Sequence, residues 1–441
     1  MVVATRSDRT GSARTVGGLA ILALLASNVG AQAPAVKPDP VKGAGLFPIA
    51  SQTSLVIRGV PGQIVVTTKP TRELRFTSKA KDKSGGERPI AVAFGETTVT
   101  MSSPAGAALP DGILRVEAPA SFSVRVEAQG GTVVVDGFAG AVGIVGKGTV
   151  VRAQALTGPV DAGVEGGSLS LANVGGGVTA RLGATSTFSA TNLRAGLNLN
   201  SHDATFKVQG LAGPFRLDAR GGSGEVTGLA GGGDLRLSES SLRLMGGKGD
   251  ITVTSDAAVE FSNMTASMRF EMDGGALHGK GNQGSVRVRA RRTDVKLEGI
   301  TGELDLDTTG AGVVVQKNTG PVTAVVFGGD AQLLELQGAV QLDIGGGNAE
   351  IAWAAIAGDK DSLLKSNNGD ITVRFPANAS CRVTARSSSG HITSDIPTLK
   401  APADAKEVQG ALGQGQRPQI EIEAEGNINL STGAKSPTAA S

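Results

Sequence analysis

Three acidic residues and a run of arginines have types and spacings that suggest chemistry. Glu303, Asp305 and Asp307 are two residues apart, which places them on one face of an extended strand. Carboxylates grouped in this way can bind Ca²⁺, or serve as acid and base in cleaving a glycosidic bond. The densest basic run can bind an anionic glycan or lipopolysaccharide, and it consists of Arg287, Arg289, Arg291 and Arg292. Alternation predicts that the first three arginines share a face.

Both groups also have a purely structural interpretation. If successive strands stack, Arg287 lies beside Asp305, and Arg289 lies between Glu271 and Asp307. Cations on either side neutralise the carboxylates, which favours a solvated charge ladder over a metal or catalytic site. We therefore assign no catalytic residue, no cofactor and no metal ligand, and we keep the four arginines as the candidate binding site for an anionic polymer.

Other residue types point to structure more than to chemistry. Gly246 to Val253 is similar to a calcium-binding nonapeptide, but its Asp is one place early and the motif is not repeated in tandem. The three histidines, which lie far apart and without a catalytic or zinc context, are His202, His278 and His391. Cys381 alternates with Val383 and is expected in a buried strand. Trp353 could be a sugar platform, and we expect it to fill the core.

The elements that must position these residues come from a repeat of 18 residues. Each copy has apolar residues at offsets 0, 2, 5, 9 and 11, with Gly at offset 7; the first copy is Val133, Val135, Phe138, Gly140, Val142 and Ile144. Thirteen copies start between 133 and 349, and these two positions are 216 residues, or twelve repeats, apart. Offset 7 is Gly in ten of the twelve complete repeats, and Ala195 and Ala266 occupy the other two.

The pattern within one repeat predicts two short strands. Apolar residues two apart indicate half-buried strands, and the Gly between the pairs is expected to allow positive φ at a sharp corner. A unit of this kind buries its apolar side only against its neighbours. We predict an all-β parallel β-solenoid, right-handed by the crossover rule, with about 18 residues per coil and about 4.8 Å between coils. Opposite charges alternate at offset 1, at Lys207, Glu225, Arg243 and Glu260, and then at His278 and Lys296, which supports this stacking.

The flanking regions give the expected organisation. Residues 1–31 are predicted to be a signal peptide, because three arginines precede a short uncharged apolar run that ends at Val29-Gly30-Ala31. We expect five further segments after it: a linker at 32–45, an N-terminal β segment and cap at 46–130, the regular solenoid at 131–357, a C-terminal β segment and cap at 358–432, and a disordered tail at 433–441. The segment from Lys79 to Arg88 is expected to be a loop.

Charge and composition bound the partners. Removing residues 1–31 takes away Arg6, Arg9, Arg14 and Asp8 and leaves 39 basic and 39 acidic residues of the chain's 42 and 40. This zero balance argues against a general attraction to nucleic acid. The mature chain has no apolar stretch long enough to be a transmembrane segment. A single Cys rules out a disulfide framework, and 12 Phe with one Trp and no Tyr give few aromatic sugar platforms.

Two segments carry a family resemblance. The run from Leu363 to Ile392, with Ser366-Asn-Asn-Gly-Asp-Ile-Thr-Val373 near its start, resembles the closing segment of a bacterial family known as putative adhesins. The opening segment of the same family is similar to three short runs, Leu114 to Pro119, Ser123 to Val126 and Gly131 to Gly137. The resemblance covers residues 50–432 and implies a secreted or envelope-associated β-solenoid of unknown function, with no catalytic residues to carry over.

Three hypotheses follow. The first is a non-catalytic rod in the periplasm, on the outer-membrane surface or outside the cell, acting as an adhesin or scaffold toward an unknown envelope or extracellular polymer or protein. The second is a module that binds anionic glycan or lipopolysaccharide through Arg287, Arg289, Arg291 and Arg292. The third is a polysaccharide-active β-helix enzyme with an acidic site around Asp305.

Overall fold

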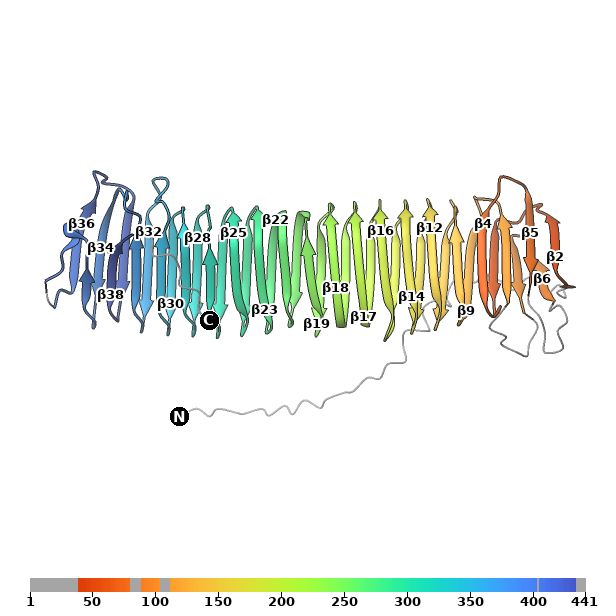
Figure 1. Cartoon of the computed structure of the whole chain (residues 1–441), viewed down its shortest axis with the longest axis horizontal. Coiled ribbons are helices and arrows are strands. Elements are labelled where there is room, and N and C mark those ends of the chain that lie inside the picture. Colours follow the sequence, from red (N-terminus) through yellow and green to blue (C-terminus); the bar gives the residue numbers. More distant parts are fainter. Residues whose placement is uncertain (1–38, 80–88, 104–111, 403, 434–441) are drawn as a thin grey trace, which may run out of the picture.

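The computed structural model is a long rod of stacked β-strands (Figure 1). It describes residues 39–79, 89–103, 112–402 and 404–433. Within these ranges the chain is all-β, with no α-helix and one short 3₁₀ turn, η1 (Pro397–Leu399). The strands form a parallel β-solenoid of about 14 turns with about 18 residues per coil, as predicted. Val133 pairs directly with Val151, one repeat further on.

Two faces make up the wall of the rod. From the N-terminal end, face 1 has the strand order β2 (Ala44–Pro48), β5 (Glu73–Ser78), β8 (Ile113–Ala118), β4 (Gln63–Thr68), β10 (Thr132–Asp136), β12 (Val150–Leu156), β14 (Ser168–Val174), β16 (Thr187–Leu193), β17 (Leu197–Leu211), β18 (Phe215–Leu229), β20 (Ser241–Met245), β22 (Val259–Asp273), β23 (Ala276–Gln283), β25 (Asp294–Thr301), β27 (Val313–Gln316), β29 (Ala331–Leu336), β31 (Ala349–Trp353), β33 (Ile371–Phe375), β38 (Ile428–Thr432) and β35 (Ile392–Ser394).

Face 2 has the order β1 (Asp39–Val41), β6 (Ile90–Phe94), β7 (Thr98–Ser102), β3 (Ser54–Arg58), β9 (Ser123–Gln129), β11 (Val142–Lys147), β13 (Val160–Glu165), β15 (Val178–Leu182), β17, β18, β19 (Gly233–Ser238), β21 (Lys248–Ser255), β22, β24 (Val286–Arg291), β26 (Leu304–Thr309), β28 (Val322–Phe327), β30 (Val340–Gly345), β32 (Ser362–Asn367), β37 (Gln419–Ala424), β34 (Cys381–Ser387) and β36 (Glu407–Leu412). Three long strands, β17, β18 and β22, bend round a corner and belong to both faces.

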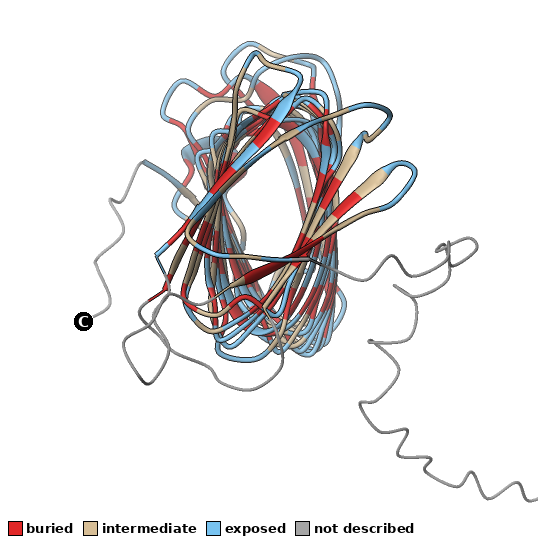
Figure 2. Cartoon of the chain, turned by 90° about the vertical axis from the view of Figure 1, so that its right-hand side faces the viewer, coloured by how far each residue is buried: buried red, intermediate tan, exposed pale blue. Residues whose placement is uncertain are grey.

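The core lies between the two faces, which enclose a flattened interior in the end view (Figure 2). Alternate side chains of every coil point inward, so that Val, Leu, Ile and Ala stack in columns along the rod. Some of the large rings have a glycine beside them in the next coil: Phe206 is followed by Gly224, and Phe261 by Gly279. A Cβ at either glycine would overlap the neighbouring ring, so size is balanced between successive coils.

The expected role of the offset-7 glycine is wrong. Eight of the ten glycines at that offset have no positive φ, and the left-handed residue of the corner lies at offset 4 instead, as at Asn173 (φ 56°) and Lys317 (φ 58°). The glycine is needed for close approach: a Cβ on Gly320 would collide with the carbonyl oxygen of Gly302, and one on Gly338 with that of Gly320. Neighbouring coils therefore touch backbone to backbone at this column.

Both ends of the rod depart from sequence order. At the N-terminal end the turn formed by β3 and β4 lies between the β7–β8 turn and the β9–β10 turn. At the C-terminal end the last turn, β37 and β38, lies between β32–β33 and β34–β35. Antiparallel strands complete the ends, with β5 and β2 on one face, β6 and β1 on the other, and β36 against β34.

The expected linker at 32–45 is wrong for its second half. Residues 39–41 form β1, paired with β6, and the strand β2 starts at Ala44 and pairs with β5. Pro40 and Pro48 lie in these outermost strands, where a missing N–H makes the edge a poorer template for another chain. The predicted signal peptide at 1–31, all but the first residue of the predicted Lys79 to Arg88 loop and all but the first residue of the predicted tail at 433–441 lie outside the described residues.

One ladder joins the expected β segments. At the expected boundary between residues 130 and 131, strand β9 before it pairs with β11 after it. At the expected boundary between residues 357 and 358, β30 and β31 pair with β32 and β33 in the same way. A loop separates β31 from β32, and the parallel pairing continues after it.

Candidate functional site

The arginine run lies on the outer surface of face 2. Strand β24 buries Val286, Val288 and Ala290 in the core, so the side chains exposed on its outer surface are those of Arg287, Arg289 and Arg291. Arg292 is not in the strand; it occupies the corner, with φ 52°. The prediction that three of the four arginines share a face is therefore confirmed, and the fourth points from the corner.

Acidic strands flank the arginines, as the stacking predicts. Arg287 pairs in register with Asp305, and its Nε donates to Asp305 Oδ2 at 2.7 Å. Arg289 lies in register between Glu271 and Asp307. Arg292 donates through Nη2 to Asp273 Oδ1 at 2.6 Å. Among the described residues, no ion pair joins Arg289 or Arg291 to a carboxylate.

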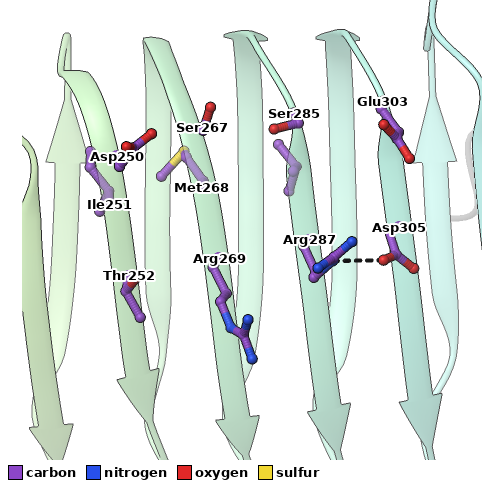
Figure 3. Close-up of a pocket in the computed structure, with 11 residues that line it drawn as sticks. Asp250, Ile251, Thr252, Ser267, Met268, Arg269, Ser285, Arg287, Glu303 and Asp305 are labelled. Carbon is purple, nitrogen blue, oxygen red and sulfur yellow. Dashed lines mark hydrogen bonds and ion pairs between the residues drawn. The ribbon is translucent and has the colours of Figure 1, made fainter.

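A shallow groove of about 300 Å³ crosses four strands beside Arg287 (Figure 3). Ser267 and Ser285 are short and lie in the middle of the groove, while Asp250 and Glu303 lie at its two ends. Arg269 and Arg287 lie along one side, and Arg269 is held through Nη2 by Glu271 Oε1 at 2.8 Å. The groove offers hydroxyls, carboxylates and guanidinium groups in one row, a set of donors and acceptors that suits a polar ligand.

The acidic trio is only partly brought together. Glu303 and Asp305 line the groove, Asp305 is bound by Arg287, and Asp307 lies further along β26 outside the groove. Within the described part of the chain, no group of three or more His, Cys, Asp or Glu side chains could hold a metal ion. Asp250, from the calcium-like segment, faces Ser267 across the ladder.

Trp353 and Cys381 belong to the core. Trp353 is 5% exposed, donates from Nε1 to the carbonyl oxygen of Gly338 at 3.0 Å and stacks on Phe375 with ring centroids 6.0 Å apart. The sugar-platform alternative is therefore wrong, and the prediction of a core side chain is confirmed. Cys381 is fully buried, and desolvation raises the pKa of its thiol to about 11. The prediction of a buried strand residue is confirmed.

The histidines remain apart. His202 pairs with Asp203 at 3.1 Å at one corner, and His391 lies 3.7 Å from Asp404 near the C-terminal end. His278 takes its place in the offset-1 column of face 1, between Glu260 and Lys296. That column has the predicted ion pairs, with Lys207 Nζ 2.9 Å from Glu225 and Arg243 Nε 3.1 Å from Glu260.

Two further surface features are not among the sequence predictions. A groove of about 330 Å³ on face 1 lies beside the buried ring of Phe206, which extends over Gly224, and Lys207, Glu225 and Arg243 lie along it. On face 2, Val325 and Phe327 of β28 point outward, although they are apolar. Val322, Ala324 and Val326 point inward, and the alternation of side chains along a strand therefore places Val325 and Phe327 on the outer surface.

Glu298 has a carboxylate whose pKa is perturbed by two lysines. Its carboxylate lies 3.1 Å from Lys317 Nζ and 3.3 Å from Lys280 Nζ, and these hydrogen bonds lower the pKa of Glu298 below its ordinary value of 4.5. A lowered pKa stabilises the folded chain above pH 4.5, and this contribution is lost as the pH falls through the folded value.

We expect Glu298→Gln to lower the free energy of unfolding at pH 7 and to have a smaller effect at pH 3, because the contribution of the ionised carboxylate is lost as the pH falls through its lowered pKa. Urea unfolding at both values measures the difference. Glu239→Gln is the matched control, since Glu239 has no ion pair among the described residues and should show no pH-dependent effect. Equal losses at pH 7 and pH 3 would contradict the assignment.

These observations define the class of protein as a capped, two-faced parallel β-solenoid. A family model described as Toastrack DUF4097 matches residues 196–431, more than half of the chain, and the chain belongs to this family. The match includes the run from Leu363 to Ile392, so the resemblance predicted from the sequence is confirmed.

Two solved structures are similar over their full lengths. One is a putative cell adhesion protein from Clostridium sporogenes, 9% identical over 90% of this chain, with a TM-score of 0.16. The other is a putative adhesin from Bacteroides fragilis, 15% identical over 58% of this chain, with a TM-score of 0.19. No curated protein matches the chain. In the described ranges, no helix has the length and apolar character needed to cross a bilayer.

Proposed function

We propose that this chain is a non-catalytic rod that acts as an adhesin or scaffold at the bacterial surface. The single observation that carries the proposal is the unbroken ladder, because it fixes the spacing of outward side chains along the whole rod. Salt bridges between adjacent coils, such as Lys207–Glu225 and Arg287–Asp305, hold these side chains in register. A surface of this kind suits an extended partner.

Export is part of this proposal and rests on residues 1–31. Their positive start, apolar run and small residues before Ala31 fit removal by a signal peptidase. Fractionation of the cell, with the mature N-terminus determined by mass spectrometry, tests it. We expect a chain that starts at Gln32 in the periplasm, at the outer-membrane surface or in the medium; an uncleaved cytoplasmic chain would contradict export.

A second candidate function is binding of an anionic glycan or lipopolysaccharide through the arginine strip, defined as Arg287, Arg289, Arg291 and Arg292. The observation that favours it is the split within the strip: Arg287 and Arg292 are ion-paired, whereas Arg289 and Arg291 have no such partner among the described residues. Two guanidinium groups on one strand are thus available for an anion.

Salt-dependent binding tests this candidate. Immobilised heparin and lipopolysaccharide are probed with the mature chain at low and high NaCl, and binding should fall with salt. Arg289→Glu should weaken it, whereas Arg216→Glu, a reversal on the same face at β18, should not. The same preparations, incubated with a panel of polysaccharides, test the third hypothesis: cleavage that disappears in Asp305→Ala would identify an enzyme and overturn the non-catalytic assignment.

A further inference from the structure

One row of side chains runs along the axis of the rod at the end of strands β22 to β30. In register, Asp273 of β22 is followed by Arg291, Thr309, Phe327 and Gly345 on the next four strands. The row lies on the outer surface of face 2. It combines a cation, a hydroxyl and an aromatic ring on a flat surface with a fixed repeat of about 4.8 Å.

Arg291 differs from the other arginines of the strip in its acidic neighbours. Arg287 and Arg289 have aspartates beside them on β26, at Asp305 and Asp307, whereas Arg291 has Thr309 at the same place. On its other side Asp273 already accepts from Arg292. The positive charge of Arg291 is thus the least compensated of the four, and no carboxylate lies between it and Phe327 in the row.

Phe327 is held as a flat platform. It is 64% exposed, the highest value among the large apolar side chains of the described chain, and Val325 beside it is 45% exposed. Its ring extends over Gly345, since a Cβ on that glycine would lie 2.6 Å from the ring. A side chain at position 345 would force the ring away from the surface. One side of the ring therefore packs on backbone while the other faces solvent.

We propose that the row of Arg291, Thr309 and Phe327 binds an acidic polysaccharide that lies along the rod axis. Arg291 binds the carboxylate of one sugar, Thr309 hydrogen-bonds to hydroxyls, and the C–H face of a following sugar packs on Phe327. Two strand steps separate Arg291 from Phe327, about 9.6 Å, which a disaccharide can span. This inference rests on the second proposed function and names its ligand class and its specificity-determining residue.

Two polymers serve as probes that distinguish the contribution of sugar-ring packing from the contribution of charge. Hyaluronan supplies alternating acidic and neutral sugars, and inorganic polyphosphate supplies negative charge without sugar rings. We expect Phe327→Ala to weaken hyaluronan binding about threefold to tenfold and to leave polyphosphate binding unchanged. Arg291→Gln should weaken both. All variants are at exposed positions, and thermal unfolding checks that they fold.

Matched controls come from the same face. Val145→Ala removes an exposed apolar side chain from β11, and Arg220→Gln removes an arginine at the equivalent place on β18, where the following strand offers Ser238. Neither should change hyaluronan binding. Unchanged hyaluronan binding in Phe327→Ala, with Arg291→Gln still weakened, overturns this inference and leaves the second proposed function standing. If the parent chain binds neither polymer, this inference is overturned, whereas the second proposed function is decided by the heparin and lipopolysaccharide measurements.

Discussion

Gly320→Ala is expected to destabilise the rod by about 2 to 3 kcal/mol, the range for overpacking a site that cannot relax. The added methyl group would meet the carbonyl oxygen of Gly302 in the preceding coil, which belongs to the backbone and cannot rotate away. The two coils must separate locally, and the hydrogen bonds of the adjacent strands weaken with them. Urea unfolding measures the loss, and hydrogen exchange should locate it in the coils around β26 and β28.

Gly163→Ala is the control for this substitution. Gly163 lies in β13, has no positive φ, and a Cβ there would have no atom within 4 Å. Because alanine also restricts the unfolded chain, this variant should be neutral or slightly more stable. If both variants behave alike, the close backbone contact does not explain the glycine column.

Truncation after Ile351 is expected to convert the chain into end-to-end oligomers. The deletion removes the last two residues of β31 and all of β32 to β38, and it leaves β30 and the rest of β31 as open edges of the two faces. Their unpaired backbone groups and the exposed apolar end of the core form a template for another chain. Sedimentation or light scattering should show assemblies that grow with concentration.

A chain that ends at Gly433 is the matched control, since it keeps every described strand. It should have the same size distribution as the full chain. A truncation at Ile351 that is monomeric and monodisperse would show that the C-terminal strands do not act as a cap.

The regular part of the fold could be predicted because the period of two within a strand and the period of 18 between coils reinforce each other. Val133 and Val151 are paired for this reason, and so are Arg287 and Asp305. The corner was misassigned because offset 4 holds no single residue type: Asn173, Gly210 and Lys317 all adopt positive φ there. The conspicuous glycine at offset 7 serves contact between coils instead.

The candidate site was only half predictable. Alternation placed Arg287, Arg289 and Arg291 on one face, but the difference among them depends on which strand faces each guanidinium and on the pairing of Asp273 with Arg292. No sequence prediction singles out Phe327, although its place in the alternation of β28 points it outward. The reordered ends depend on pairings between distant segments, which no local pattern encodes.

The reordering of the last turn has a mechanical consequence. A load applied to the C-terminal end of the chain reaches β38 first, and this strand is hydrogen-bonded on one side to β33 and on the other to β35. Two rows of hydrogen bonds must therefore shear together before any strand is extracted, whereas a terminal strand at an open edge would peel away one bond at a time. A tether attached at that end could transmit tension into the rod without unravelling it.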